Sequence, residues 1–263
     1  MTPAPSLDEL WNSIRSGEST FQRDRISGLP AGARRYLEHA IAPGTPLASG
    51  VRLRMHGEIK LGRWLPFTAN QVIRWDHTQA AHPQGEQLHS EQAMIWKAAV
   101  RMNGMTIRGF DRLIDGEGAM RWKILGIIPI MTASGPDITR SAAGRVIAES
   151  PWLPSALCGD DVSWAEQGPF HPHACLTVRG EIGELALAVD DQGALKSLSL
   201  SRWGNPGGAD FHYVPFGGVV EQEGSFSGYT IPTRLRVGYY PGTERFEQDG
   251  EFFRCTVDEA LYR

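Results

Sequence analysis

Alternation of apolar and polar residues is the feature that most constrains how this chain can fold. From Val51 onward the apolar residues recur at every second position instead of at every third or fourth. In the first such segment Leu53, Met55 and Ile59 alternate with charged residues. An antiparallel strand with one buried and one solvated face has this pattern. Further segments of the same kind follow almost to the C-terminus, separated mainly by turns rich in Gly, Pro and Asp.

Helical patterns are few and lie in two places. Two short ones, near residues 6–17 and 30–41, precede the first strand, and Ser6 or Asp8 can cap the first of them. A long one begins at Asp137 or Thr139, either of which can cap it. After the last strand pattern, EFFRCTV, the sequence predicts a short terminal helix. Strands and helices do not alternate, which argues against a parallel α/β fold.

We therefore expect a mainly β protein of the β-rich α+β class. Its strands, about ten by this pattern, would form a strongly curved antiparallel sheet or open β-barrel wrapped around a central helix near residues 137–150. The N-terminal helices, in residues 1–45, would pack on the sheet formed by residues 46–263. No repeat, linker or low-complexity segment divides the chain, so residues 1–263 are expected to form a single domain.

Composition excludes several classes of function. The chain has 263 residues, a net charge of −4 and no run of basic residues longer than two, so nucleic-acid binding is not expected. No apolar run approaches the roughly 20 residues of a membrane span, and the N-terminus lacks a signal-peptide pattern, which predicts a cytoplasmic location. A homodimer is one possible assembly, on which the sequence carries no signal.

The central helix carries the first candidate site residues. Arg145 and Glu149 are four positions apart and so project from the same helix face. If that face turns into the sheet, Glu149 is a candidate catalytic acid or base and Arg145 a candidate substrate anchor. The alternative is a structural ion pair that fastens the helix to the sheet.

Two polar residues interrupt apolar strand faces. Gln71 shares a face with Phe67 and Ile73, and Asp111 shares one with Ile107. A buried polar group without a hydrogen bond costs about 1–3 kcal/mol, so such residues are often kept for a site. We predict that Asp111 is the second catalytic carboxylate and that Gln71 binds substrate, against the alternative of a satisfied buried network or a strand edge nearer to water.

Further candidates for substrate binding come from aromatic residues and from the segment after the central helix. Trp96, Trp152 and Tyr229 are expected to line an aromatic cavity, and Ser155 lies in the corner that follows Pro154. Covalent catalysis at Ser155 is not favoured, because no histidine is evident beside it.

No cofactor or metal is expected. His171, His173 and Cys175 could share one strand face, but no fourth ligand is evident, and Pro172 marks this strand as a sheet edge. The sequence leaves open whether these three bind a metal. The glycine-rich segment at residues 204–208 lacks the lysine and the spacing of a phosphate-binding loop.

Several long motifs resemble a bacterial family of unknown function. They are WLPFTANQ at Trp64–Gln71, the strand at Trp96, Gly109–Gly118, RVIAESPWLPSAL at Arg145–Leu157 and the C-terminal Gly228–Arg263. The resemblance runs from Leu29 and implies a fold similar to lipoprotein carriers (LolA-like), a curved antiparallel sheet around helices with an apolar cavity. Many relatives carry an additional apolar N-terminal segment that this sequence lacks, which argues against a membrane-linked role.

Two functional hypotheses follow. In the first, the protein binds a small hydrophobic or aromatic molecule in an enclosed cavity and transforms it by cofactor-independent acid–base chemistry, of the lyase, isomerase or hydrolase type. In the second, it is a non-catalytic carrier or sensor of a lipid-like ligand. A scaffold whose interior is filled by its own side chains is a third and weaker hypothesis.

Overall fold

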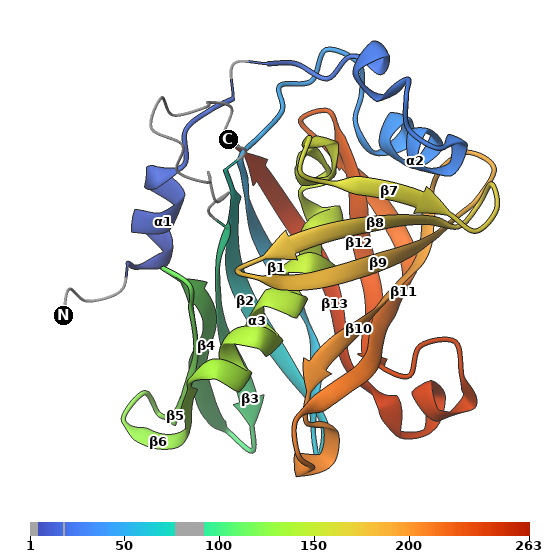
Figure 1. Ribbon diagram of the computed structural model, residues 1–263. Helices are drawn as coiled ribbons and strands as arrows, with labels where there is room; N and C mark the ends of the chain where they lie inside the picture. Colours follow the sequence, from blue (N-terminus) through green and yellow to red (C-terminus); the bar gives the residue numbers. More distant parts are fainter. Residues whose placement is uncertain (1–4, 18, 77–91) are drawn as a thin grey trace.

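One antiparallel sheet of thirteen strands dominates the computed structural model (Figure 1), which describes residues 5–17, 19–76 and 92–263. The order across the sheet is β6-β5-β4-β3-β2-β1-β13-β12-β11-β10-β9-β8-β7. The strands are β1 (Gly50–Leu61), β2 (Arg63–Trp75), β3 (Gln92–Met102), β4 (Met105–Ile114), β5 (Glu117–Ile124), β6 (Ile128–Ser134), β7 (Ser163–Glu166), β8 (Pro172–Val178), β9 (Glu181–Val189), β10 (Leu195–Gly204), β11 (His212–Phe226), β12 (Tyr229–Tyr239) and β13 (Glu251–Tyr262).

Few helices accompany the sheet. They are α1 (Leu7–Ser13), α2 (Ala31–Ala40), α3 (Pro136–Glu149) and the short helical turns η1 (Arg23–Ile26), η2 (Ser150–Trp152), η3 (Pro154–Cys158), η4 (Pro206–Gly208) and η5 (Phe246–Gly250). No helix in these described ranges is both long and apolar enough to cross a bilayer.

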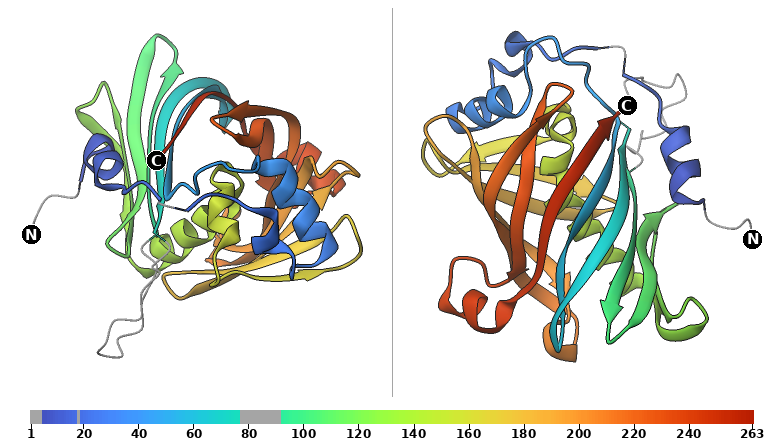
Figure 2. Two further views of the ribbon diagram at one scale, coloured as in Figure 1. Left: turned by 90° about the horizontal axis from the view of Figure 1, so that it is seen from above. Right: turned by 180° about the vertical axis from the view of Figure 1, so that it is seen from behind.

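The sheet curls into a barrel that stays open between its two edge strands, β6 and β7. Helix α3 lies across this opening, inside the curve of the sheet (Figure 2). On one flank the hydroxyl of Thr139 accepts a hydrogen bond from the backbone N–H of Gly118 in β5, at 2.9 Å. On the other flank Arg202 of β10 donates to the carbonyl oxygen of Ser141, at 3.0 Å. The helix therefore connects both halves of the open sheet.

Glycines in the strands let α3 approach the sheet closely. A Cβ atom on Gly118 would lie 2.7 Å from the carbonyl oxygen of Ile138, and one on Gly183 would lie 2.7 Å from a side-chain carbon of Ile147. The helix buries Val146 and Ile147 completely against the sheet. This close packing replaces the strand pairing that would otherwise close the barrel.

The N-terminal helices cover two other parts of the sheet. Ser6 caps α1 in a reciprocal capping box with Glu9, as the sequence predicts for Ser6. Leu10 and Ile14 pack with Val72 on the outer face of the sheet. Helix α2 lies at one end of the barrel, opposite the β5–β6 turn (Figure 1).

The expected fold class is confirmed, but three details of the sequence-based prediction are wrong. The alignment of Met120, Trp122 and Ile128 in the sequence predicts a single strand, but the segment forms β5 and β6. Leu125 and Gly126 adopt positive φ angles of 52° and 75° and reverse the chain between them. The predicted terminal helix is a strand, since β13 pairs with β1 as far as Tyr262, whereas its pairing with β12 ends at Thr256. Helix α3 begins after Gly135, with Pro136 in its first turn, so neither predicted residue is its cap.

We predict that Gly118→Val destabilises the fold by forcing α3 away from β5. Overpacking at such a contact costs about 1–3 kcal/mol, and each kcal/mol corresponds to a fall in Tm of about 2–4 °C for chains of this size. Thermal unfolding measures the effect. Gly28→Ala is the control, because a Cβ atom there meets nothing within 4 Å; an equal change in Tm for both variants would contradict this account of the helix contact.

Candidate functional site

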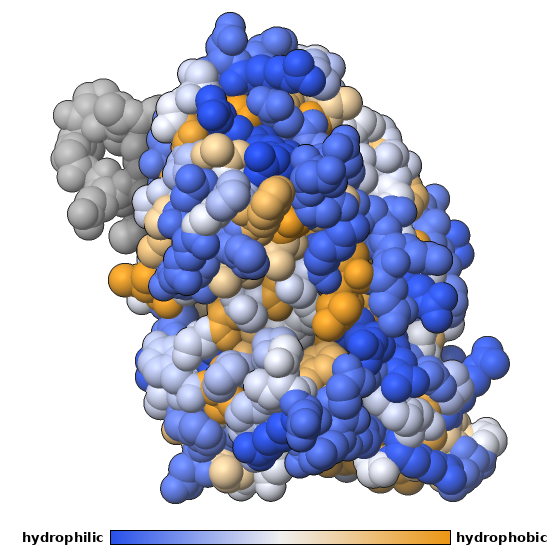
Figure 3. Space-filling model, turned by 90° about the vertical axis from the view of Figure 1, so that its right-hand side faces the viewer, coloured by the Kyte–Doolittle hydropathy of each residue, from blue (hydrophilic) through white to orange (hydrophobic). Residues whose placement is uncertain are grey.

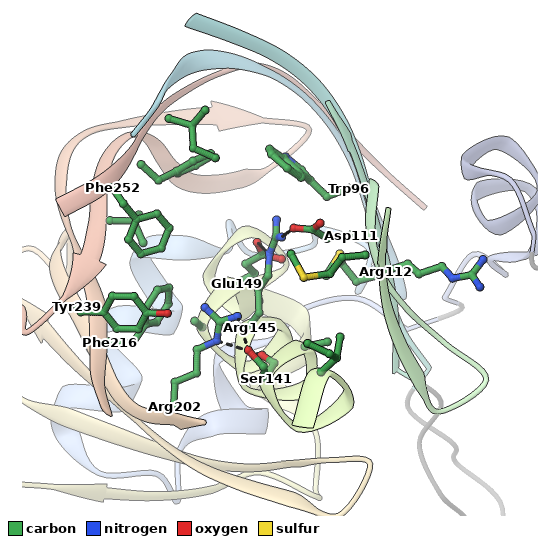
Figure 4. Close-up of a pocket in the computed structure, with 18 of the residues that line it drawn as sticks. Trp96, Asp111, Arg112, Ser141, Arg145, Glu149, Arg202, Phe216, Tyr239 and Phe252 are labelled. Atoms are coloured by element: carbon green, nitrogen blue, oxygen red, sulfur yellow. Dashed lines mark hydrogen bonds and ion pairs between the residues drawn. The ribbon is translucent and has the colours of Figure 1, made fainter. Parts of the chain in front are cut away.

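A hollow of about 470 Å³ lies between α3 and the concave face of the sheet (Figure 4). Its volume falls within the roughly 300–1,000 Å³ typical of small-molecule sites. Most of its lining is apolar. The aromatic part of the lining consists of Trp96, Trp122, Trp152, Phe211, Phe216, Tyr239, Phe252 and Phe253.

The aromatic rings contact one another along the wall of the hollow. Trp96 lies between Trp122 and Phe253, with ring centroids 5.7 and 6.1 Å away. On the neighbouring strands the ring of Tyr239 lies 5.8 Å from that of Phe216 and 5.4 Å from that of Phe252. Because the residues come from β3, β5, β11, β12 and β13, only the curvature of the sheet brings them together.

Arg145 projects from α3 and holds two carboxylates. Its Nε donates to Glu149 at 2.7 Å, and its Nη1 donates to Asp111 of β4 at 2.9 Å. The guanidinium also lies over the ring of Trp96, 5.0 Å from the centroid. Burial alone would lower the pKa of Arg145, but the two carboxylates raise it above its usual range.

Each oxygen of the two carboxylates accepts a hydrogen bond. Gln71 of β2, which is fully buried, donates to the second oxygen of Glu149 at 2.5 Å, and the indole of Trp122 donates to the second oxygen of Asp111 at 3.1 Å. The side chains of Asp111 and Glu149 keep 18% and 12% of their surface exposed toward the hollow. The structure therefore brings together four of the residues singled out in the sequence, Gln71, Asp111, Arg145 and Glu149, in one network.

Arg202 of β10 is a site residue that the sequence analysis missed. It lines the hollow, where Nε and Nη2 donate to the carbonyl and hydroxyl oxygens of Ser141, at 3.0 and 3.2 Å. Its guanidinium lies over the ring of Phe216, 4.6 Å from the centroid (Figure 4). The strand pattern LKSLSLSRWG places Arg202 among alternating polar residues, so no local signal distinguishes it from a solvated arginine.

The charge of Arg202 has no carboxylate partner among the described residues. Nη1 makes no hydrogen bond in this part of the chain, whereas the nearby carboxylates both bind Arg145. Burial lowers the pKa of Arg202, an effect that the neighbouring Tyr239 partly offsets. Since a guanidinium stays charged in proteins, the hollow contains a poorly solvated cation with free donors.

Two predicted substrate-binding residues lie elsewhere. Ser155 is buried outside the hollow and donates to the carbonyl oxygen of Ala48 at 2.6 Å. Tyr229 donates to the carbonyl oxygen of Pro46 at 2.6 Å and accepts from the N–H of Ala48 at 2.8 Å. The prediction for both residues needs correction, because their hydroxyls hold the segment that leads into β1. Trp152 does line the hollow, and its indole donates to Pro232 at 3.0 Å.

The histidine segment is arranged differently from the prediction. Strand β8 lies between β9 and the short edge strand β7, so Pro172 does not mark an edge of the sheet. The imidazole of His173 lies 2.6 Å from the carboxylate of Glu184 on β9. No group of three or more His, Cys, Asp or Glu side chains suited to a metal occurs within the described ranges.

Comparison with protein families identifies the group to which the chain belongs. Residues 27–262 match the model of a family described as a family of unknown function (DUF6920). The chain is therefore a member of this family, and the resemblance noted in its motifs is confirmed. No curated protein matches the chain.

Two solved structures are similar in fold. The crystal structure of a DUF1329 family protein from Desulfovibrio piger shares 11% identity and a TM-score of 0.45, over 88% of this chain and 92% of that one. The crystal structure of a putative outer membrane lipoprotein-sorting protein domain from Vibrio parahaemolyticus shares 7% identity and a TM-score of 0.38, over 82% of this chain and 86% of that one.

The cytoplasmic location expected from the sequence is corrected by this comparison. The second structure is described as a putative outer membrane lipoprotein-sorting protein domain; this description of that protein is at odds with the cytoplasmic expectation and assigns no location to this chain. The expectation rested on the missing signal-peptide pattern and on the lack of a long apolar run.

We predict that the carboxyl group of Asp111 titrates above its usual value near 3.8, because burial raises its pKa more than Arg145 and Trp122 lower it. A raised pKa in the folded state means that stabilisation is complete below the unfolded value and is lost as the pH rises through the folded value. The free energy of unfolding, measured relative to Asp111→Asn, should therefore decrease as the pH increases from about 4. Urea unfolding at a series of pH values measures this difference, and an increase with pH would contradict the prediction.

Proposed function

We propose that the protein binds a lipid-like molecule with a single acidic group and carries or senses it without changing it. The observation that supports this proposal best is the guanidinium of Arg202, which has no carboxylate partner among the described residues and lies in a mostly apolar hollow. The apolar chain of the ligand would lie among the aromatic rings, and its carboxylate or phosphate would accept hydrogen bonds from Arg202.

The hydrophobic lining supports the apolar part of this ligand. Phe216 and Tyr239 stand beside Arg202, while Phe252 and Phe253 continue the aromatic wall away from it. Each methylene group that leaves water for such a surface contributes about 0.8 kcal/mol to binding. A chain anchored at one end by Arg202 would therefore gain affinity with length until it fills the hollow.

Acid–base catalysis by Glu149 and Asp111 is the second candidate function. In its favour, both carboxylates reach the hollow, and burial raises the pKa of Asp111. Against it, Arg145, Gln71 and Trp122 already occupy every oxygen of the pair. Each oxygen keeps a second lone pair, but these hydrogen bonds already hold both carboxylates to the protein, so the arrangement favours the carrier over the enzyme.

The first test compares two ligands with the same number of carbon atoms, one with a charged carboxylate head group and one with a neutral hydroxyl. We expect the wild-type protein to bind dodecanoate and, more weakly, dodecanol in isothermal titration. Arg202→Gln should weaken dodecanoate binding roughly ten- to a hundredfold, because it removes a hydrogen bond between charged groups. Dodecanol binding should remain unchanged.

Arg140→Gln is the matched control, because Arg140 is paired with Glu181 outside the hollow. Failure of the wild-type protein to bind either ligand would contradict binding in the hollow. If Arg202→Gln weakened the binding of both ligands equally, this would contradict the anchoring role of Arg202 but not ligand binding in the hollow.

The second test separates the carrier from the enzyme. We expect Glu149→Gln to retain dodecanoate with a Kd within about threefold of the wild-type value, because Glu149 binds Arg145 and Gln71 instead of the ligand. Mass spectrometry of molecules extracted from freshly purified wild-type and variant protein should find the same compound in both. Accumulation of a different compound in the variant would indicate that Glu149 acts on a substrate, and would favour the enzyme.

A further inference from the structure

The exposed apolar side chains of this protein gather at one end of the barrel. Of the eleven large apolar residues that are exposed among the described ones, seven lie on the turns and the adjoining strand segments at this end. We call them the apolar rim: Leu61, Met105, Leu125, Ile127, Ile128, Ile130 and Met131. Ile127 is the most exposed, at 73%. The far end of the barrel carries α2 (Figure 1).

The apolar rim borders the opening of the hollow. Leu61, Ile130 and Met131 belong both to the rim and to the lining of the hollow. Their strands, β1 and β6, reach the same end of the molecule as the turn between β10 and β11 (Figures 1 and 2). A molecule that enters the hollow at this end therefore passes the rim.

Basic side chains cover the adjoining outer face of the sheet. Strands β3, β4 and β5 are in register, with Lys97 paired to Phe110 and Phe110 to Arg121, and with Arg108 paired to Lys123. Residues paired in this way point to the same side of a sheet, and Asp111 and Trp122 in the alternate positions point inward. The resulting basic face consists of Lys97, Arg101, Arg108, Arg112, Arg121 and Lys123.

The basic face is uncompensated within the part of the chain that the structure describes. None of its six residues forms an ion pair there, whereas most arginines on β1, β12 and β13 do. Figure 4 shows Arg112 pointing away from the hollow, on the outer side of β4. The protein as a whole has a net charge of −4, so this concentration of positive charge is local.

From these two surfaces we infer that the protein docks on an anionic membrane, with the apolar rim inserted among the lipids and the basic face against their headgroups. Exposed apolar residues, such as those of the rim, beside clustered Lys and Arg are typical of peripheral membrane binding. The exposed aliphatic residues favour a lipid surface over a nucleic acid, whose backbone would engage the basic face alone. The side of the molecule in Figure 3 is mostly hydrophilic, with apolar side chains only in small separate patches.

This inference does not require a membrane-spanning helix, and it goes beyond ligand binding in the hollow. Docking in this orientation would turn the opening of the hollow toward the bilayer. A single apolar chain could then pass between the membrane and the aromatic wall without crossing water, which is the costly step for such a molecule.

Vesicle flotation tests the inference. The full-length chain is mixed with vesicles of phosphatidylcholine alone, or with vesicles in which roughly one lipid in three is phosphatidylglycerol. We expect flotation with the anionic vesicles, little with the neutral ones, and a decrease as salt is added. Arg108→Glu combined with Lys123→Glu should weaken binding about tenfold or more, since each basic residue contributes through the surface potential.

A second variant tests the rim. Ile127→Asp combined with Ile128→Asp should abolish flotation, because Ile127 ends the exposed β5–β6 turn and Ile128 begins β6, so that their insertion would bury charges. Ile182→Asp is the control for apolar exposure, at 67% exposed on β9, and Arg15→Glu with Arg23→Glu is the control for charge. Both controls should float like the wild-type protein.

Three results would overturn the inference: no flotation of the wild-type protein, equal loss in the control variants, or binding to duplex DNA without binding to vesicles. Dodecanoate titration of the same variants keeps this test separate from the proposed function. The rim and basic-face variants should still bind dodecanoate in solution, so a membrane defect with intact ligand binding concerns the docking surface alone.

Discussion

The structure depends on how helix α3 covers the concave face of an open sheet. Thirteen strands curl far enough to enclose an interior but stop short of pairing β6 with β7, and α3 fills the space between these edges. Arg145 is the central contact of that helix, since its guanidinium binds one carboxylate on α3 and one on β4. Removing one partner of such a buried pair is costly, because the other charge is left without compensation. The helix is therefore fixed in position by charge as well as by apolar packing.

The same contact explains why a hollow remains. The ionic network occupies the middle of the interior, where Gln71 and Trp122 complete it, and it keeps polar groups on α3 facing the sheet. Aromatic side chains line the wall around this network without filling the space next to Arg202. Within the described residues this interior combines an apolar wall with a cation that lacks a carboxylate partner, and it is therefore complementary to an amphipathic anion.

The opening of the hollow lies next to the apolar rim and the basic face. The rim residues Ile130 and Met131 face both the opening and the solvent, and the basic face begins on the strands next to them. A single orientation on a charged lipid surface would satisfy the rim, the basic face and the opening together. The expectation that a membrane-linked role is unlikely rested on the missing apolar segment, a property of the sequence that says nothing about a surface assembled from turns.

The sequence by itself determined most of the strands, the three α-helices and four residues of the ionic network, Gln71, Asp111, Arg145 and Glu149. Some signals are local and can be recognised without knowledge of the fold. They include the period-two alternation, the cap at Ser6 and the polar positions at Gln71 and Asp111. The turn at Leu125 and the strand at the C-terminus were mispredicted, because positive φ angles and pairing with β1 decide them. Only the tertiary structure decided that Arg202 reaches the hollow, that Ser155 and Tyr229 do not, and that basic residues dispersed along three strands form one face. The physical reason is the same in each case: curvature and register place side chains from distant segments together, and neither is encoded in the spacing within one strand.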